Sequence, residues 1–246
     1  MVCHVDMGHR TAGFSDAGQI MIKLSLKRLW IRFRLWQLSI RWLGGGQWYQ
    51  YVEFGNGLTN SRSSLGNRQN EKQYVRTESF LAYLESEDLF TTDDVIVDIG
   101  SNAGLFSLVA AQRCKQVWGV EIDKPSLRQA KFLKAHWKAT GKRVDNVIFL
   151  HGDIMDHLNL LSQATVVFAS KVLYHALLGD GVFKLMEAIE QSPVRLIVMQ
   201  GHSGLTTPRH GQYGEDEGMR DLVMKHGFDY RLVVDVPKFP ISIARR

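Results

Sequence analysis

The chain has 246 residues, of which 45% are hydrophobic and 22% charged, so it has the composition of an ordinary globular protein with a substantial core. A formal net charge of +5 favours phosphate-bearing or membrane-surface partners only weakly. Cys3 and Cys114 are the only cysteines, which excludes a disulfide framework and a cysteine metal site and predicts a cytoplasmic protein.

The N-terminal region begins with residues 1–19, which show no periodicity and predict a flexible tail. The next domain element, residues 20–73, opens with apolar residues at steps of four and three. They predict one face of a basic amphipathic helix ended by Gly44-Gly45-Gly46: Ile22, Leu26, Leu29, Phe33, Trp36, Ile40 and Leu43. Six Lys and Arg residues interrupt the stretch, which argues against a signal peptide or a membrane span.

Residues 22–43 leave three uses open. The helix could pack against the main domain or a second copy of the chain, lie on a membrane surface and make the protein membrane-peripheral, or face RNA. Residues 48–54 predict a short strand closed by a turn at 55–57, and residues 59–73 predict a loop that is either a lid or a plain linker. A helical pattern resumes over 74–84.

From Asp94 onward, short apolar runs alternate with helical patterns, and we place the main domain at 74–246. The pattern predicts a doubly wound α/β fold with a mostly parallel seven-stranded sheet. The helices nearest the first two strands are expected at 105–113 and 125–140. The expected strands lie at 95–99, 117–121, 147–150, 165–169, 196–199, 229–236 and 239–244, with the last two too close for a crossover and therefore antiparallel.

The turn after the first strand, Asp98-Ile99-Gly100-Ser101-Asn102-Ala103-Gly104, is weak evidence of a ligand site when taken alone. Glu121 strengthens it, because this acid ends the second strand 21 positions after Gly100, where a carboxylate can bind both hydroxyls of a ribose. Asn102 and Leu105 replace small residues of the dinucleotide fingerprint, so an adenosine cofactor without a pyrophosphate is favoured. Asp123 is the competing acid, and we expect it to cap the helix that Pro125 begins.

Together with Gly152-Asp153 and the terminal hairpin, these motifs resemble the class I S-adenosylmethionine-dependent methyltransferases over roughly residues 74–246. The resemblance implies that S-adenosylmethionine is the cofactor and S-adenosylhomocysteine the product, with Glu121 on the ribose, Ile122 against the adenine and Asp153 on the adenine amino group. Asn102 departs from the commoner glycine and is expected to loosen the turn slightly. The implied cofactor-binding residues are Asp98, Gly100, Ser101, Asn102, Gly104, Glu121, Ile122, Asp153 and Ser170.

Two polar segments, 170–175 and 200–213, follow the fourth and fifth strands and are expected to border the substrate. Leu173-Tyr174-His175 faintly resembles enzymes that modify the tRNA wobble uridine. No metal site is predicted, because no carboxylate or cysteine cluster accompanies the histidines. The candidates for proton removal are His175, His202 and His210, and those for substrate contact are Lys171, Tyr174, Arg209 and Tyr213.

The sequence therefore predicts a methyltransferase that acts on an oxygen or nitrogen of a small molecule or glycan. The alternatives are a tRNA-modifying methyltransferase, an NAD-dependent oxidoreductase and a non-catalytic scaffold that keeps the fold.

Overall fold

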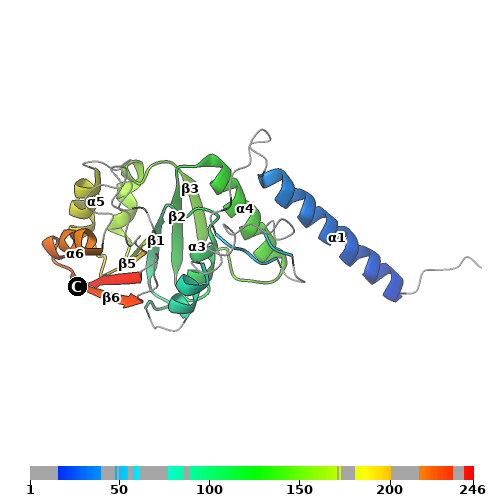
Figure 1. Ribbon diagram of the computed structural model, residues 1–246, viewed down its shortest axis with the longest axis horizontal. Coiled ribbons are helices and arrows are strands. Elements are labelled where there is room, and N and C mark those ends of the chain that lie inside the picture. Colours follow the sequence, from blue (N-terminus) through cyan, green and yellow to red (C-terminus); the bar gives the residue numbers. More distant parts are fainter. Residues whose placement is uncertain are drawn as a thin grey trace, which may run out of the picture.

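The computed structural model describes residues 16–39, 48, 50–54, 58–60, 77–85, 89–170, 172, 181–200, 216–234 and 241–246. Its centre is a seven-stranded sheet in the order β3-β2-β1-β4-β5-β7-β6, with helices on both faces (Figure 1). The strands are β1 Val95–Ile99, β2 Gln116–Glu121, β3 Val147–His151, β4 Val166–Ser170, β5 Leu196–Gln200, β6 Asp229–Val234 and β7 Ile241–Arg245. The predicted doubly wound α/β fold is confirmed.

The sheet buries both faces because its central strands carry continuous apolar runs. Along β1, Ile96 packs into one core cluster, while Val97 and Ile99 pack into the other. The first cluster also holds side chains of α3 (Leu105–Ala110) and α4 (Lys124–Ala139). The second is covered by the 3-10 helix η3 (Ile154–Ser162), α5 (Gly181–Glu190) and α6 (Asp216–Lys225).

The C-terminal strands confirm the predicted antiparallel pair. β7 pairs antiparallel with β5 on one side and with β6 on the other, so β6 forms the edge of the sheet. The residues between them, 235–240, lie outside the described part of the chain. The predicted capping role of Asp123 is also confirmed, because its carboxylate accepts a 2.9 Å hydrogen bond from the Ser126 amide at the start of α4. The first crossover helix is shorter than expected and ends at Ala110.

The N-terminal helix differs from the prediction in its start and in the face that it buries. α1 spans Asp16–Ser39, so it begins inside the predicted tail, and it projects away from the sheet (Figure 1). Ile31, Leu35 and Leu38 are its buried residues. The predicted apolar face is instead exposed where the structure describes it, at Leu26, Leu29, Phe33 and Trp36. Both faces of the helix carry apolar residues, so periodicity alone could not decide which one packs.

The segment that follows α1 is joined to the core rather than forming the predicted strand. Its described residues form one antiparallel bridge, between Glu53 and Thr59. Trp48, Val52 and Phe54 are buried in the same cluster as α4. The predicted turn at 55–57, the loop over 61–73 and Gly44-Gly45-Gly46 lie outside the described residues, and the helix expected at 74–84 is described over 77–85.

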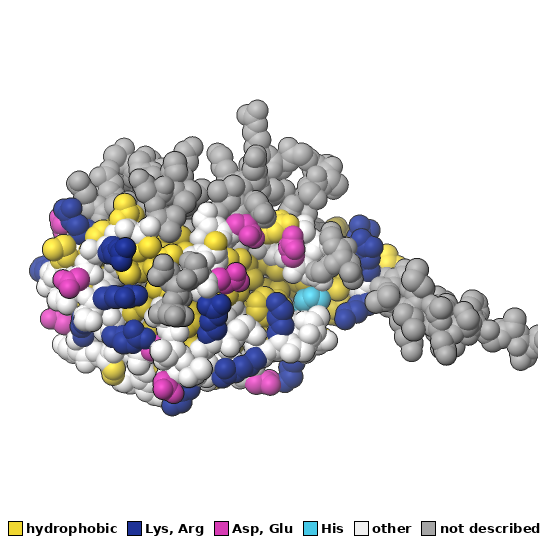
Figure 2. Space-filling view, turned by 90° about the horizontal axis from the view of Figure 1, so that it is seen from below, with side chains coloured by type: hydrophobic (Ala, Val, Ile, Leu, Met, Phe, Trp, Pro, Cys, Tyr) yellow, Lys and Arg dark blue, Asp and Glu magenta, His cyan; other side chains and the backbone are white. Residues whose placement is uncertain are grey.

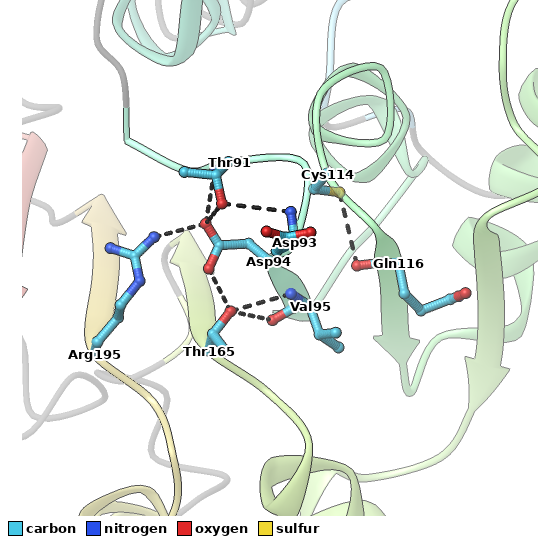
Figure 3. A network of polar contacts seen from close by, with 8 residues as sticks. All are labelled: Thr91, Asp93, Asp94, Val95, Cys114, Gln116, Thr165 and Arg195. Carbon is cyan, nitrogen blue, oxygen red and sulfur yellow. Dashed lines mark hydrogen bonds and ion pairs between the residues drawn. The ribbon is translucent and has the colours of Figure 1, made fainter.

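A polar network closes the amino end of the sheet (Figure 3). The carboxylate of Asp94, just before β1, accepts hydrogen bonds from the Thr165 hydroxyl at 2.6 Å and from the Thr91 amide at 2.6 Å. Arg195, just before β5, completes the set with an ion pair at 2.6 Å. Burial raises the pKa of Asp94, but these hydrogen bonds and the Arg195 charge outweigh burial and hold the pKa below its usual value.

Candidate functional site

The candidate site lies at the carboxyl end of β1, where the strand order reverses. β1 pairs in parallel with β2 on one side and with β4 on the other, and the chain leaves β1 through the turn at 100–104 into α3. Ligands of open α/β sheets bind beyond the carboxyl ends of the strands at such a reversal. The turn that the sequence singled out therefore occupies the position where a ligand is expected.

The turn is held by hydrogen bonds from every one of its backbone amides. The amides of Gly100 and Ser101 donate to the Val120 carbonyl, and the amide of Gly104 donates to the Ser101 carbonyl. The amides of residues 102, 103 and 105 donate to side chains, namely those of Glu121, Asn102 and Gln50. A pyrophosphate site needs amides that are free to donate, so this turn is poorly suited to a dinucleotide.

Asn102 takes a left-handed conformation with φ of 56°. Asparagine tolerates this region better than most residues, and its side chain is used here: the Oδ1 atom accepts a 2.9 Å hydrogen bond from the Ala103 amide. The Asn102 amide donates to Glu121 at 2.7 Å. These two bonds offset the loosening expected when glycine is absent from the centre of the turn.

The glycines of the turn are required by packing as well as by backbone conformation. A Cβ atom on Gly100 would lie 2.5 Å from the Val172 side chain, and one on Gly104 would lie 2.4 Å from the Phe149 ring. Gly119 in β2 faces the same ring, at 2.7 Å. The φ angles of Gly100 and Gly104, 68° and 76°, are also ones that other residues rarely adopt. The small residues thus let the turn, β2 and β3 approach closely.

Glu121 provides the carboxylate of the site. It is 6% exposed, and its Oε2 and Oε1 atoms accept hydrogen bonds from the Asn102 amide at 2.7 Å and the Asp123 amide at 2.8 Å. Burial raises the pKa of Glu121, and the two amides partly offset that rise. Each carboxylate oxygen can accept a further hydrogen bond, so the fixed group has the capacity to hold two ribose hydroxyls.

Ile122, next along the chain, is 56% exposed although it is apolar. An exposed apolar side chain directly after the acid that is predicted to bind the ribose suits the flat face of an adenine. Asp153 lies on the neighbouring strand connection, where its Oδ1 atom accepts a 3.0 Å hydrogen bond from the Met155 amide and caps η3. A carboxylate has two oxygens, so capping leaves Oδ2 able to accept from an adenine amino group. The assignment of both residues to adenine stays a prediction.

Asp98 is a second buried carboxylate of the site, 1% exposed. Its Oδ2 atom accepts a 2.5 Å hydrogen bond from the Ser107 hydroxyl, which ties β1 to α3. Burial raises the pKa of Asp98 to about 7, with a further rise from the nearby charge of Glu121 and a partial offset from Ser107. Ser101 is equally buried, and its hydroxyl has no hydrogen-bond partner among the described residues.

Two glutamines contribute to this edge: Gln50 was not expected from the sequence, and Gln200 was expected in the loop 200–213 rather than at the end of β5. Gln50 lies far away in the chain, yet its Oε1 atom accepts a 3.0 Å hydrogen bond from the Leu105 amide at the start of α3. Gln200, the last residue of β5, is fully buried and its Oε1 atom accepts a 3.0 Å hydrogen bond from the Ser170 hydroxyl at the end of β4. A polar residue that ends an apolar strand was the signal available for Gln200, whereas no local pattern marks Gln50.

The described residues contain no group of three or more His, Cys, Asp or Glu side chains arranged to hold a metal ion.

The residues that were predicted to remove a proton or to contact the substrate are not among those that the structure describes. The predicted residues that lie outside the described part of the chain are His175, His202, His210, Lys171, Tyr174, Arg209 and Tyr213.

Residues 90–216 match the model of a protein family described as a methyltransferase domain. An uncharacterized protein of Methanocaldococcus jannaschii is 30% identical over 103 residues, which is 42% of this chain. The match spans 37% of that relative, well under half of its length.

Solved structures of similar fold share little sequence with this chain. Magnesium protoporphyrin IX methyltransferase from Synechocystis, solved with bound S-adenosylmethionine, is 18% identical with a TM-score of 0.55, and the match covers 78% of this chain and 87% of that one. The N-terminal domain of EvdMO1, solved with S-adenosylhomocysteine, is 16% identical with a TM-score of 0.57, over 89% and 96% of the two chains. Because the sequence identities are this low, the structural similarity establishes a shared fold and nothing more.

Proposed function

We propose that this chain methylates an oxygen or nitrogen of a small molecule or glycan. The chain belongs to the methyltransferase-domain family, and its domain is therefore an S-adenosylmethionine-dependent methyltransferase domain. The observation that carries the proposal is the fixed carboxylate of Glu121, which two amides hold beside the turn at 100–104. That arrangement supplies what an adenosine needs. The bonded amides of the turn argue against the pyrophosphate of NAD.

The described residues divide the binding of the cofactor among three strand ends. Glu121 at the end of β2 holds the ribose, and Ile122 covers the adenine. Asp153 after β3 accepts from the adenine amino group, and the turn after β1 lies under the methionine part. When bound, S-adenosylmethionine supplies a methyl group on a positively charged sulfur, so the protein has to position an acceptor rather than activate the donor.

The acceptor is assigned to the segments that follow β4 and β5. The hydrogen bond between Ser170 and Gln200 joins the ends of these strands, so both segments leave the sheet at the edge where the cofactor turn lies. The segments contain the histidines that could remove a proton from an acceptor hydroxyl, His175, His202 and His210. Lys171, Tyr174, Arg209 and Tyr213 are the proposed substrate contacts.

Cofactor binding can be tested by calorimetry of the purified chain with S-adenosylhomocysteine, with NAD titrated in parallel. In Glu121→Gln, one carboxylate oxygen becomes an amide nitrogen that cannot accept from a ribose hydroxyl or a backbone amide. We expect its dissociation constant to rise at least about tenfold, equivalent to about 1.4 kcal/mol. Asp145→Asn is the matched control, because this acid is exposed and forms a surface ion pair with Lys138.

Several results would contradict the proposal: no binding of S-adenosylhomocysteine at millimolar ligand, tighter binding of NAD, or unchanged affinity in folded Glu121→Gln. The acceptor class needs a separate experiment, in which transfer of a labelled methyl group is followed into metabolite and RNA pools. Label in the small-molecule or glycan fraction supports the proposed acceptor. Label that appears only in tRNA would replace it with the tRNA-modifying alternative.

A further inference from the structure

The helix α1 has an apolar face that the described part of the chain leaves largely exposed, although Trp30 at its edge touches Phe132 of α4. Its buried residues Ile31, Leu35 and Leu38 face α4, where the Leu38 carbonyl accepts a hydrogen bond from Gln129. At 3.6 residues per turn, the opposite face carries five large apolar side chains, each more than half exposed. They are Leu26, Leu29, Trp30, Phe33 and Trp36, and they are called here the outer face.

Basic residues flank the outer face on both sides. On the helical wheel, Lys27 and Arg34 lie along one edge and Arg28 and Arg32 along the other. All except Arg34, which is half-buried against Phe132, are exposed. No acidic residue occurs from 17 to 52. In Figure 2, apolar and basic side chains lie together where α1 meets the globular part of the molecule.

The neighbouring helix α4 extends this positive charge. α1 packs on α4 through Trp30 and Phe132, whose ring centroids lie 5.8 Å apart. α4 contains no Asp or Glu, and its exposed residues include Arg128 and Lys131. The outer face is therefore an apolar strip with exposed basic residues on its own helix and on the helix packed beside it.

These features fit an anionic bilayer surface better than any other partner. Apolar side chains can enter the boundary between headgroups and acyl chains, tryptophans favour that boundary, and flanking Lys and Arg reach the phosphates. A second copy of the chain would place its own basic edges against these and be repelled. RNA would use the charge but leave the apolar strip in water. In the described part of the chain, no helix is long and apolar enough to cross a membrane.

We propose that the outer face of α1 docks the protein on the surface of an anionic lipid bilayer, with the helix lying parallel to the membrane. Docking uses the outer face together with Lys27 and Arg32 from its two edges. It goes beyond methyl transfer and does not depend on which acceptor the site takes.

The test is sedimentation of the full chain with vesicles of phosphatidylcholine alone or with a third of phosphatidylserine. We expect binding to the anionic vesicles that weakens with salt, because the basic residues supply part of the attraction. Phe33→Ser/Trp36→Ser is expected to reduce the bound fraction at least tenfold, and Lys27→Gln/Arg32→Gln to do so at low salt. The matched controls, Met224→Ser for an exposed apolar residue and Lys184→Gln for an exposed base, should bind as the unchanged protein does.

Three outcomes would overturn the proposal. The protein could fail to bind either vesicle, the two double variants could bind as the controls do, or light scattering could show a dimer that Phe33→Ser/Trp36→Ser dissociates. Calorimetry with S-adenosylhomocysteine on the same preparations separates this test from that of the enzyme. α1 projects away from the sheet whose strand β2 ends at Glu121, so its variants should keep cofactor affinity (Figure 1). Circular dichroism of each variant establishes that a loss of binding does not come from unfolding.

Discussion

Asp94 and Asp98 are two buried aspartates at opposite ends of the same strand, and their surroundings shift their pKa values in opposite directions. Asp94 is 4% exposed and Asp98 1%. Hydrogen bonds and the charge of Arg195 outweigh burial at Asp94 and lower its pKa. At Asp98, burial outweighs the hydrogen bonds from the hydroxyl and the backbone of Ser107, the nearby acid Glu121 adds to the rise, and the pKa reaches about 7.

This contrast indicates that the two ends of the sheet have different roles. At the amino end, every group around Asp94 favours its charge, so the network stabilises the fold by joining the starts of β1, β4 and β5 (Figure 3). At the carboxyl end, Asp98 and Glu121 are two acids whose burial outweighs their hydrogen bonds, and the charge of Glu121 also acts on Asp98. Such an arrangement costs stability in the free protein and suits a cofactor that carries positive charge. Three substitutions test this division.

The largest expected effect on folding is that of Asp94→Asn. The neutral amide removes the ion pair with Arg195 and turns one of the two accepting oxygens into a donor, so the network around position 94 cannot keep all its hydrogen bonds. We expect the free energy of unfolding in urea to fall by about 3 kcal/mol, near the lower end for a broken buried pair because the Arg195 side chain is 46% exposed. The affinity for S-adenosylhomocysteine should be unchanged.

The exposed neighbour Asp93 provides the control, and Asp93→Asn should change the free energy of unfolding by less than about 0.5 kcal/mol. If Asp94→Asn were to weaken cofactor binding while leaving unfolding unchanged, the division of the sheet into a structural and a functional end would be wrong.

A smaller effect is expected from Gly104→Ala, which tests whether the functional end also contributes to folding. The new Cβ would meet the Phe149 ring, and the φ of 76° at position 104 is strained for alanine. We expect a loss of about 2 kcal/mol in the free energy of unfolding, from backbone strain and overpacking together. Gly141→Ala separates the two causes, because Gly141 has a φ of 80° and no atom within 4 Å of the added Cβ.

Gly141→Ala should therefore show only the backbone part, and the difference between the variants measures the contact with Phe149. Equal losses in the two variants would mean that the ring moves aside at no cost. Phe149→Leu in the Gly104→Ala protein should recover the steric part and leave the backbone part.

The features that could be predicted from the sequence are those set by neighbouring residues. The apolar runs of β1 to β5, the glycine turn and the capping role of Asp123 each depend on a short stretch of chain, and the structure places them at or near the expected residues. Glu121 could be found because a parallel sheet brings the ends of adjacent strands together.

What could not be predicted depends on contacts between distant segments. α1 is apolar on both faces, so its buried side is decided by the shape of α4 rather than by its own periodicity. Gln50 meets the start of α3 across 55 positions of sequence, and Arg195 meets Asp94 across 101. Neither contact leaves a local pattern in a single sequence.

The last expected effect is a change of stability with pH rather than a loss of stability at one pH. A carboxyl with a pKa of 3.8 in the unfolded chain and about 7 in the folded protein binds more protons when folded between these values. Stability from this group is therefore complete below about pH 4 and is lost as the pH rises towards 7, by up to about 1.4 kcal/mol per pH unit. Asp98→Asn cannot ionise, so urea unfolding between pH 4.5 and 7 should fall less steeply than in the unchanged protein. Ser107→Ala removes the hydroxyl that favours the charged form of Asp98, so the free energy of unfolding should fall more steeply with pH. Equal slopes in all three proteins would show that Asp98 is ionised at pH 4.5 and that both ends of β1 carry ordinary acids.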